Sequence, residues 1–234
     1  MSYVWKEMKN DRDNILLDIA NHLILNASNM SNLGLFHGKM GVAIFFYLYG
    51  RYSRLSYYTD FADILLDELF SELDISLSVS FENGLSGIGW GIEYLVQNNY
   101  IDGDTYEILY EVNSIFMQKI DIRRCQDLSW ETGLKGILYY VLTHLTSFVR
   151  NKTVIPFDKL FLTDLLNTIN GIEPDTDKLI VSFKEYMQEH YFSSEKITFP
   201  SFLMGKADIK ENYIENSLGL YDGLAGVGLK FILL

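Results

Sequence analysis

The sequence has few of the residues on which several classes of protein depend. It contains a single cysteine, Cys125, so one chain cannot form an internal disulfide or a thiolate metal cage. Its three prolines, Pro156, Pro174 and Pro200, all fall between residues 150 and 216. Because proline interrupts helices, we expect regular helices elsewhere and an irregular segment at about 150–216.

Basic residues are also scarce, with 19 Lys and Arg against 31 Asp and Glu, which gives a net charge of -12. Nucleic-acid binding depends on Lys and Arg that neutralise phosphates, so we expect no nucleic-acid partner. A basic peptide would be attracted to such a surface, although an acidic balance is also common in ordinary cytosolic proteins.

Long apolar stretches are missing as well. No run reaches the roughly 20 residues that a membrane-spanning helix needs, and residues 1–13 lack the apolar core of a signal peptide. We therefore expect a cytoplasmic protein with no membrane partner. Apolar residues still make up 48% of the chain, which is enough for a continuous core.

A short phrase, Gly-x-x-Gly followed by an apolar residue, occurs four times. The first glycines of the four copies are Gly38, Gly84, Gly133 and Gly223. Successive copies are 46, 49 and 90 residues apart, so the last gap is about twice the period. A repeat of this length is typical of solenoids, propellers and closed arrays of paired elements, and it favours a single domain over residues 1–234.

Each phrase opens an apolar segment, and the segments between the phrases are amphipathic. Apolar runs are expected to be buried inner helices, whereas segments with one apolar stripe are expected to be outer helices. The expected inner helices begin at the four phrases and cover 42–49, 84–96, 133–148 and 223–234; the expected outer helices cover 13–25, 57–73 and 102–120. If such a ring closes, the first helix supplies the outer partner of the last inner helix.

Two segments fit this alternation less well. Residues 75–81 alternate in polarity like a strand, but an isolated strand has no partner, so we interpret them as a linker. Residues 157–169 and 176–191 are expected to be amphipathic helices, and they belong either to a degenerate repeat without glycines or to an inserted helical hairpin.

The residues before the first glycines are His37, Asn83, Thr132 and Asp222, and three of these four types are favoured helix N-caps. The second glycine removes a side chain from the same helical face, which permits close packing or leaves space at the mouth of a cavity. Two interpretations follow. The four residues only cap helices, or they line a shared pocket together with Glu82, Glu131 and Tyr221.

The phrases 34–38, 83–89 and 220–229 resemble the lanthionine synthetase C-like (LanC-like) family, and the resemblance covers about residue 13 to the end. It implies an all-α fold, an α/α toroid of inner and outer helix pairs. The family commonly has seven pairs, whereas this chain has room for four or five, so the toroid is incomplete or reduced.

The resemblance also implies where a zinc site would lie. Family cyclases hold zinc with a cysteine before the glycine of one repeat and a Cys-His pair before that of a later one, and the zinc activates a peptide thiol. The corresponding phrases here are similar to Trp130-Glu131-Thr132-Gly133 and Tyr221-Asp222-Gly223. All three ligand positions are changed to oxygen donors, which suit harder cations. We therefore predict no metal, no cofactor and no zinc-dependent cyclisation.

The sequence thus predicts a LanC-like protein that acts in peptide modification by binding a peptide substrate or a partner modification enzyme. The alternative is an α/α-toroid enzyme that uses Glu82, Glu131 or Asp222 in acid/base catalysis on a carbohydrate. The candidate site residues are His37, Glu82, Asn83, Trp130, Glu131, Thr132, Tyr221 and Asp222, and no catalytic residue is assigned among them.

Other single residues give weaker signals. Cys125 follows Arg123 and Arg124, which would lower the pKa of its thiol, but a lone thiol without a nearby histidine is more often inert. His144 lies in an apolar helix and is expected to be a hydrogen-bonded core or pocket residue. The sequence contains no Ser-His-Asp elbow, phosphate loop or His-Glu-x-x-His phrase.

Overall fold

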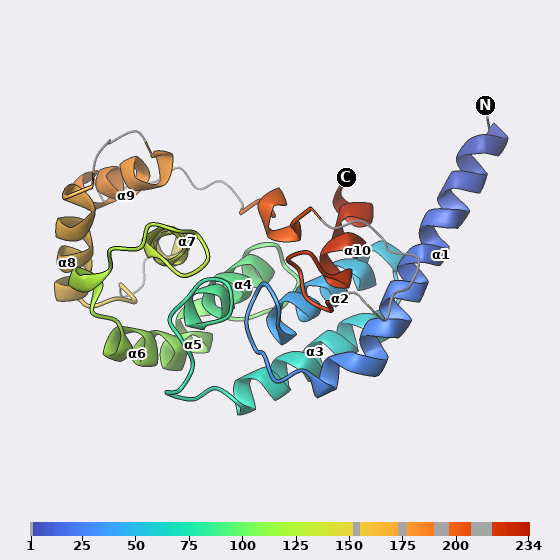
Figure 1. The fold of residues 1–234 in the computed structure, drawn as a ribbon, viewed down its shortest axis with the longest axis horizontal. Helices are drawn as coiled ribbons and strands as arrows, with labels where there is room; N and C mark the ends of the chain where they lie inside the picture. Colours follow the sequence, from blue (N-terminus) through green and yellow to red (C-terminus); the bar gives the residue numbers. More distant parts are fainter. Residues whose placement is uncertain (1, 152–154, 173–176, 190–196, 207–216) are drawn as a thin grey trace. The chain divides into compact units, whose positions relative to one another are not determined.

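A computed structural model describes residues 2–151, 155–172, 177–189, 197–206 and 217–234 (Figure 1). All regular structure in these ranges is helical, apart from an isolated bridge between Ser217 and Gly223, so the all-α expectation is confirmed. The α-helices are α1 (Ser2–Asn26), α2 (Lys39–Ser53), α3 (Ser56–Ser71), α4 (Leu85–Gln97), α5 (Thr105–Ile108), α6 (Tyr110–Lys119), α7 (Leu134–Asn151), α8 (Lys159–Asn170), α9 (Lys178–Glu189) and α10 (Leu224–Leu233). The connections within the described ranges contain the short 3-10 helices η1 (Ala27–Asn29), η2 (Ile122–Arg124) and η3 (Ser201–Met204).

The contacts within the chain divide it into two compact units. Unit 1 combines residues 1–72 with residues 199–234, so it contains both ends of the chain, and unit 2 comprises residues 73–198. The single domain over residues 1–234 stays a prediction.

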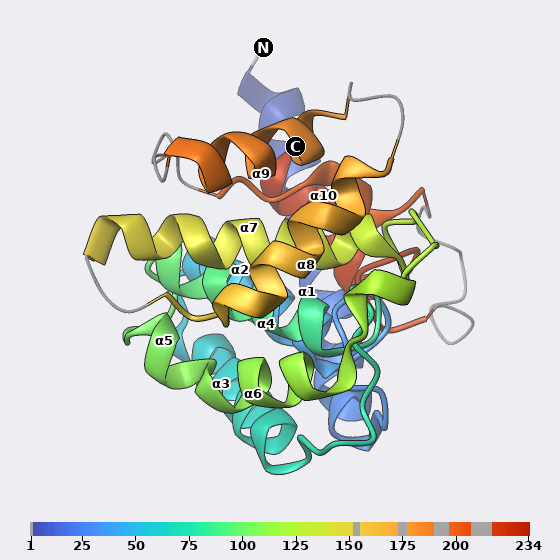
Figure 2. The same ribbon diagram turned by 90° about the vertical axis from the view of Figure 1, so that its left-hand side faces the viewer.

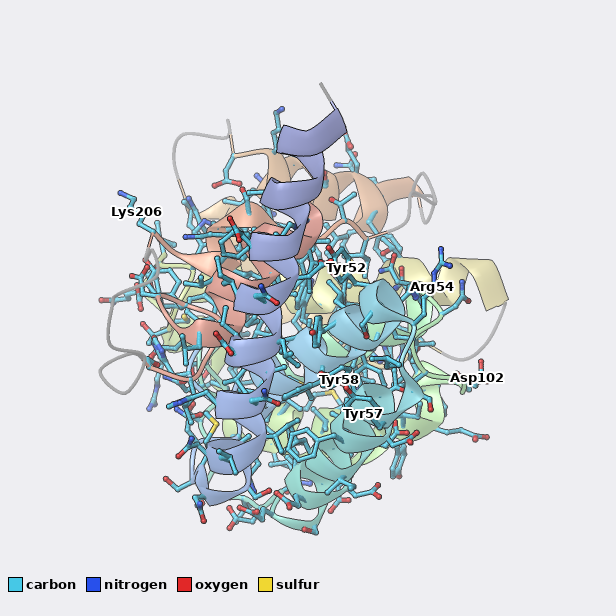
Figure 3. All side chains as sticks on the ribbon, turned by 90° about the vertical axis from the view of Figure 1, so that its right-hand side faces the viewer. Tyr52, Arg54, Tyr57, Tyr58, Asp102 and Lys206 are labelled. Carbon is cyan, nitrogen blue, oxygen red and sulfur yellow. The ribbon has the colours of Figure 1, made fainter. Side chains whose placement is uncertain are left out.

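Unit 1 is built around α2, which is buried on all sides from Lys39 to Gly50, as its apolar sequence predicts. α3 packs against α2 with one face only, as expected of an outer helix. Arg54 ends α2 in the left-handed conformation, with φ 61°, and Figure 3 shows it near Tyr52, at the end of the same helix. α10 packs against both α2 and α1, so the first helix does contact the last inner helix.

Unit 2 is built around α4 and α7, which pack against each other. α4 is buried from Leu85 to Leu95, and α9 lies against α7 (Figure 2). The single outer helix expected over 102–120 is wrong, because it is divided into α5 and α6. The chain leaves the helical conformation at the buried Leu109, where φ is -95° and ψ is 5°.

The linker expected at residues 75–81 is confirmed, because this segment forms turns and extended chain without a strand. Lys119 fixes it by donating to the carbonyl oxygens of Ile75 and Leu77. The two helices expected in the irregular segment are present as α8 and α9, which contact each other. The ends of the second expected helix, at residues 176, 190 and 191, lie outside the described residues.

Candidate functional site

Each of the four glycine phrases is the last part of a ten-residue segment that we call a glycine loop. The last three residues of each segment are the first residues of a helix. Loop A is 32–41, loop B is 78–87, loop C is 127–136 and loop D is 217–226. In every loop the helix begins one residue after the first glycine, at Lys39, Leu85, Leu134 and Leu224. The expectation that the residue before this glycine is the N-cap is therefore wrong.

The helices are capped by backbone instead of side chains. In all four loops the first helical N–H donates to the carbonyl oxygen seven residues earlier, which is that of the first loop residue. Such a bond satisfies one of the donors that the first turn of a helix leaves free. The four bonds join Lys39 to Asn32, Leu85 to Ser78, Leu134 to Asp127 and Leu224 to Ser217, with N···O distances of 2.9, 2.9, 2.8 and 2.7 Å.

The loop folds back against the first helical turn, which explains the first glycine of every phrase and the second glycine of loops A, C and D. A Cβ atom on Gly84 would lie 2.2 Å from the carbonyl oxygen of Ser78, the same oxygen that caps the helix. A Cβ atom on Gly136 would lie 2.2 Å from the carbonyl oxygen of Trp130. Equivalent contacts occur at Gly38, Gly133 and Gly223, and at Gly41 and Gly226. Glycine is required because the backbone of the same loop approaches closely.

Loops B and C are joined in unit 2. The N–H groups of Phe81 and Glu82 both donate to the carbonyl oxygen of Glu131, at 2.9 and 3.0 Å. Phe81 also fills the space at the second glycine of the next loop, since a Cβ on Gly136 would lie 2.4 Å from the Phe81 Cβ.

Loops D and A are joined in unit 1 in the same way. The N–H of Tyr221 donates to the carbonyl oxygen of Phe36 at 2.9 Å. Leu220, which has the same position in loop D as Phe81 in loop B, would lie 2.8 Å from a Cβ on Gly41. The last glycine loop therefore contacts the first as the second contacts the third.

The inner helices repeat this relation. A Cβ on Gly89 of α4 would lie 2.3 Å from the Tyr140 ring of α7, and a Cβ on Gly228 of α10 would lie 2.4 Å from the Phe45 ring of α2. Gly89 and Gly228 each follow the first glycine of their loop by five residues, and Tyr140 and Phe45 by seven. Close helix packing at these glycines offsets the helix stability that each loses relative to alanine, about 1 kcal/mol.

Sequence reasoning missed the first residue of the loops, which is a small polar residue in every copy: Asn32, Ser78, Asp127 and Ser217. Asn32 accepts the N–H of Gly34 at 2.8 Å through its side chain, and Asp127 does the same for Ser129 at 2.8 Å. The Thr132 hydroxyl, expected to cap the helix, donates to Asp127 at 2.6 Å. Its hydrogen bond and those of Ser129 lower the pKa of the Asp127 carboxyl.

Three of the predicted site residues lie together in unit 1. The His37 ring meets the Tyr221 ring edge to face, with centroids 6.1 Å apart, and Tyr221 stacks on Phe36. Asp222 has a left-handed backbone, with φ 52°, and its carboxylate accepts the N–H of Lys206.

The other five predicted site residues lie in loops B and C of unit 2. The Trp130 ring packs edge to face on Tyr139, with centroids 5.5 Å apart. Like the three in unit 1, these residues have half-buried or exposed side chains: Glu82, Asn83, Trp130, Glu131 and Thr132. The glycine loops thus leave all eight predicted side chains accessible, and a pocket shared by the two groups stays a prediction.

The donors at the three positions that the resemblance matches to zinc ligands do not fit a thiol-activating zinc ion. Glu131, Tyr221 and Asp222 offer only oxygen, and the Asp222 carboxylate already accepts a backbone N–H. Within the described ranges, no group of three or more His, Cys, Asp or Glu side chains is arranged to hold a metal ion.

A buried polar network joins α4, α6 and α7. His144 and Glu93 are both fully buried, and the His144 Nδ1 atom bonds the Glu93 carboxylate. Nε2 of His144 lies 2.9 Å from the Asn113 amide nitrogen, and the Tyr140 hydroxyl donates to the Asn113 carbonyl oxygen at 2.5 Å. His144 is therefore a hydrogen-bonded core residue, as predicted. Glu93 was missed because its partner lies 51 residues away.

The environment of Cys125 differs from the prediction. Burial and the nearby Asp127 carboxylate raise the pKa of its thiol. The expected lowering by Arg123 and Arg124 is wrong, because both guanidinium groups pair with carboxylates: Arg123 with Asp121 and Asp164, and Arg124 with Asp121.

Comparisons of the chain with protein-family models, with curated proteins and with solved structures found no match. The likeness to the LanC-like family therefore depends on the glycine phrases alone. No helix within the described ranges has the length and apolar character needed to cross a membrane.

Proposed function

We propose that the chain is a LanC-like α/α toroid that acts in peptide modification as a peptide-binding or accessory protein, without zinc-dependent cyclase activity. The observation that carries this proposal is the repeated construction of the glycine loops. Backbone hydrogen bonds fix each loop, while the side chains just before the first glycine stay accessible. A rigid framework that presents accessible side chains on loops is a common arrangement for binding.

The contacts between loops support the toroid. In a linear array each repeat contacts only its neighbours, so the last copy does not contact the first. Here loop D contacts loop A through Leu220 and Gly41, as loop B contacts loop C through Phe81 and Gly136. This is the relation that closure of a ring requires.

The chemistry of the loops supports binding over cyclisation. Thiol activation in the family uses cysteine and histidine ligands, and the corresponding positions here are Glu131, Tyr221 and Asp222. Carboxylates that are accessible on rigid loops suit recognition of a peptide with basic or hydrogen-bonding groups.

A binding titration tests the proposal. Precursor peptides and modification enzymes encoded near the gene are titrated against the protein, and we expect at least one to bind. Glu131→Gln and Asp222→Asn should each weaken binding up to about fivefold, the range for a partly exposed charge pair. Asp60→Asn, a change on the exposed face of α3, is the matched control and should bind as the wild type does.

Two outcomes would count against the proposal. If none of these peptides or enzymes binds, the accessory role is wrong. If the purified protein hydrolyses a glycoside and Glu131→Gln or Asp222→Asn abolishes that hydrolysis, the carbohydrate enzyme replaces it.

A further inference from the structure

A cavity of about 440 Å³ lies in unit 2, between α5 and α6 and the segment that leads into α8. This volume falls within the usual range for small-ligand sites, about 300–1,000 Å³. Its lining includes two tyrosines, Tyr106 and Tyr110, together with Asn113, Met117, Phe157 and Asp158. None of the eight predicted site residues in the glycine loops lines this cavity, so it is a separate candidate site.

The charge of the lining favours a cation. Among the described residues that line the cavity, Asp158 is the only charged one. Asp158 is the N-cap residue of α8, but its exposed side chain makes no capping hydrogen bond. Within the described ranges this carboxylate has no ion-pair partner. The N-terminus of α8 carries a partial positive charge of roughly half a unit, which offsets only part of the negative charge of the carboxylate.

The aromatic lining also favours a cation. Tyr106 of α5 and Tyr110 of α6 lie on either side of the break at Leu109, with ring centroids 6.4 Å apart, and Tyr110 is 66% exposed. A cation over the face of such a ring gains about 0.5–2 kcal/mol, more as it loses water. Met117 and the buried Phe157 add apolar surface for the aliphatic part of a long basic side chain.

The buried network orients a further polar side chain of the lining, that of Asn113, which is 4% exposed. Nε2 of His144 lies 2.9 Å from the Asn113 amide nitrogen, so the Asn113 carbonyl oxygen is turned toward the Tyr140 hydroxyl. The Asn113 carbonyl oxygen then accepts the Tyr140 hydroxyl and keeps a second lone pair for a ligand donor.

We propose that this cavity binds a cationic side chain, the guanidinium of arginine or the ammonium of lysine, on a peptide or protein. Asp158 supplies the counter-charge, the tyrosine rings supply cation–π contacts, and the Asn113 carbonyl oxygen accepts a hydrogen bond. The inference goes beyond the role in peptide modification and does not depend on it.

The test is an NMR titration of the full chain with N-acetyl-arginine amide, with N-acetyl-lysine amide and with N-acetyl-citrulline amide. Citrulline has nearly the shape of arginine but no charge. We expect saturable shifts of the Asn113 side-chain NH₂ signals with at least one of the two cations, and affinity for citrulline about tenfold lower, as for loss of a charged hydrogen bond. Added salt should weaken the binding of the cation.

Three variants define the site. Asp158→Asn and Tyr110→Leu, both at exposed side chains, should each weaken binding of the cation severalfold, whereas Asp60→Asn should leave it unchanged. Well-dispersed spectra of all three variants show that they are folded. Equal affinity for citrulline and the cations, unchanged binding by Asp158→Asn, or no shift with either cation overturns the proposal. Because the probes are single amino-acid amides, failure here leaves the peptide-modification role to its own test.

Discussion

At the scale of single residues, the glycines of the phrase are explained by close approach within a loop. Gly136→Ala would place a Cβ 2.2 Å from the Trp130 carbonyl oxygen and 2.4 Å from the Phe81 Cβ. Neither atom is the flexible end of a side chain, so the loop or the helix must move. We expect the free energy of unfolding to fall by about 1–3 kcal/mol, measured by urea denaturation.

Gly171 supplies the matched control. It follows α8, has φ -81°, and a Cβ there would lie 3.5 Å from its nearest neighbour, the Thr168 carbonyl oxygen. Gly171→Ala should leave stability unchanged or raise it by up to about 1 kcal/mol, because alanine restricts the unfolded chain. Equal losses in the two variants would show that the contacts at Gly136 are not the cause.

Asp127 makes loop C sensitive to acid. Hydrogen bonds from Thr132 and Ser129 lower the pKa of its carboxyl below the ordinary value of 3.8. A lowered folded-state pKa contributes stability above the unfolded pKa, and this contribution is lost as the pH falls through the folded pKa. Urea denaturation should therefore find the wild type more stable than Asp127→Asn at pH 7, with a difference that shrinks below pH 3.8. A difference that stays constant or grows on acidification would contradict this assignment.

At the scale of helices, the buried pair of Glu93 and His144 connects α4 to α7. His144→Leu leaves a fully buried carboxylate that keeps only Gln97 and Ser147 as hydrogen-bond partners. Removing one partner of a buried pair costs about 3–5 kcal/mol. We expect a loss of this size in the free energy of unfolding.

The double variant Glu93→Leu, His144→Leu removes both members of the pair and should be more stable than His144→Leu alone, because no uncompensated charge is then buried. The single variant Glu93→Leu completes the comparison. If the double variant loses as much free energy of unfolding as His144→Leu and Glu93→Leu lose together when measured singly, the two side chains do not act as a pair.

The helices themselves were largely predictable from the sequence. Apolar periodicity located α2, α3, α4 and α7 to within a few residues, because burial depends on local pattern. The break at Leu109 was not predictable, since Leu109 has an apolar side chain in register with the stripe and only its backbone angles end α5.

The candidate site was less predictable for a physical reason. The sequence shows which side chain precedes each glycine, but the cap comes from a carbonyl group seven residues earlier, which every residue has. The small polar residues that begin the loops, such as Asn32 and Asp127, were a signal that a comparison of the four copies could have found. The Asn113–His144–Glu93 network joins residues far apart in sequence and gives no local pattern.

At the scale of the whole molecule, each compact unit contains one pair of joined glycine loops, B with C or D with A. The unit with both ends of the chain shows that the last copy is matched to the first. This repetition supports the proposal of a framework for binding, in which the accessible Glu131 of unit 2 and Tyr221 and Asp222 of unit 1 are the residues proposed to contact a peptide.

The most direct test of this account uses one mixture of the protein with a dehydrated, cysteine-containing precursor peptide encoded near its gene. Cyclisation leaves the peptide mass unchanged but consumes a thiol, so free thiols are counted by alkylation and mass spectrometry, with zinc added and with zinc chelated. The account predicts that the peptide binds equally in both conditions and that its thiol count stays constant. Loss of thiols when zinc is added, or binding that requires zinc, would contradict it.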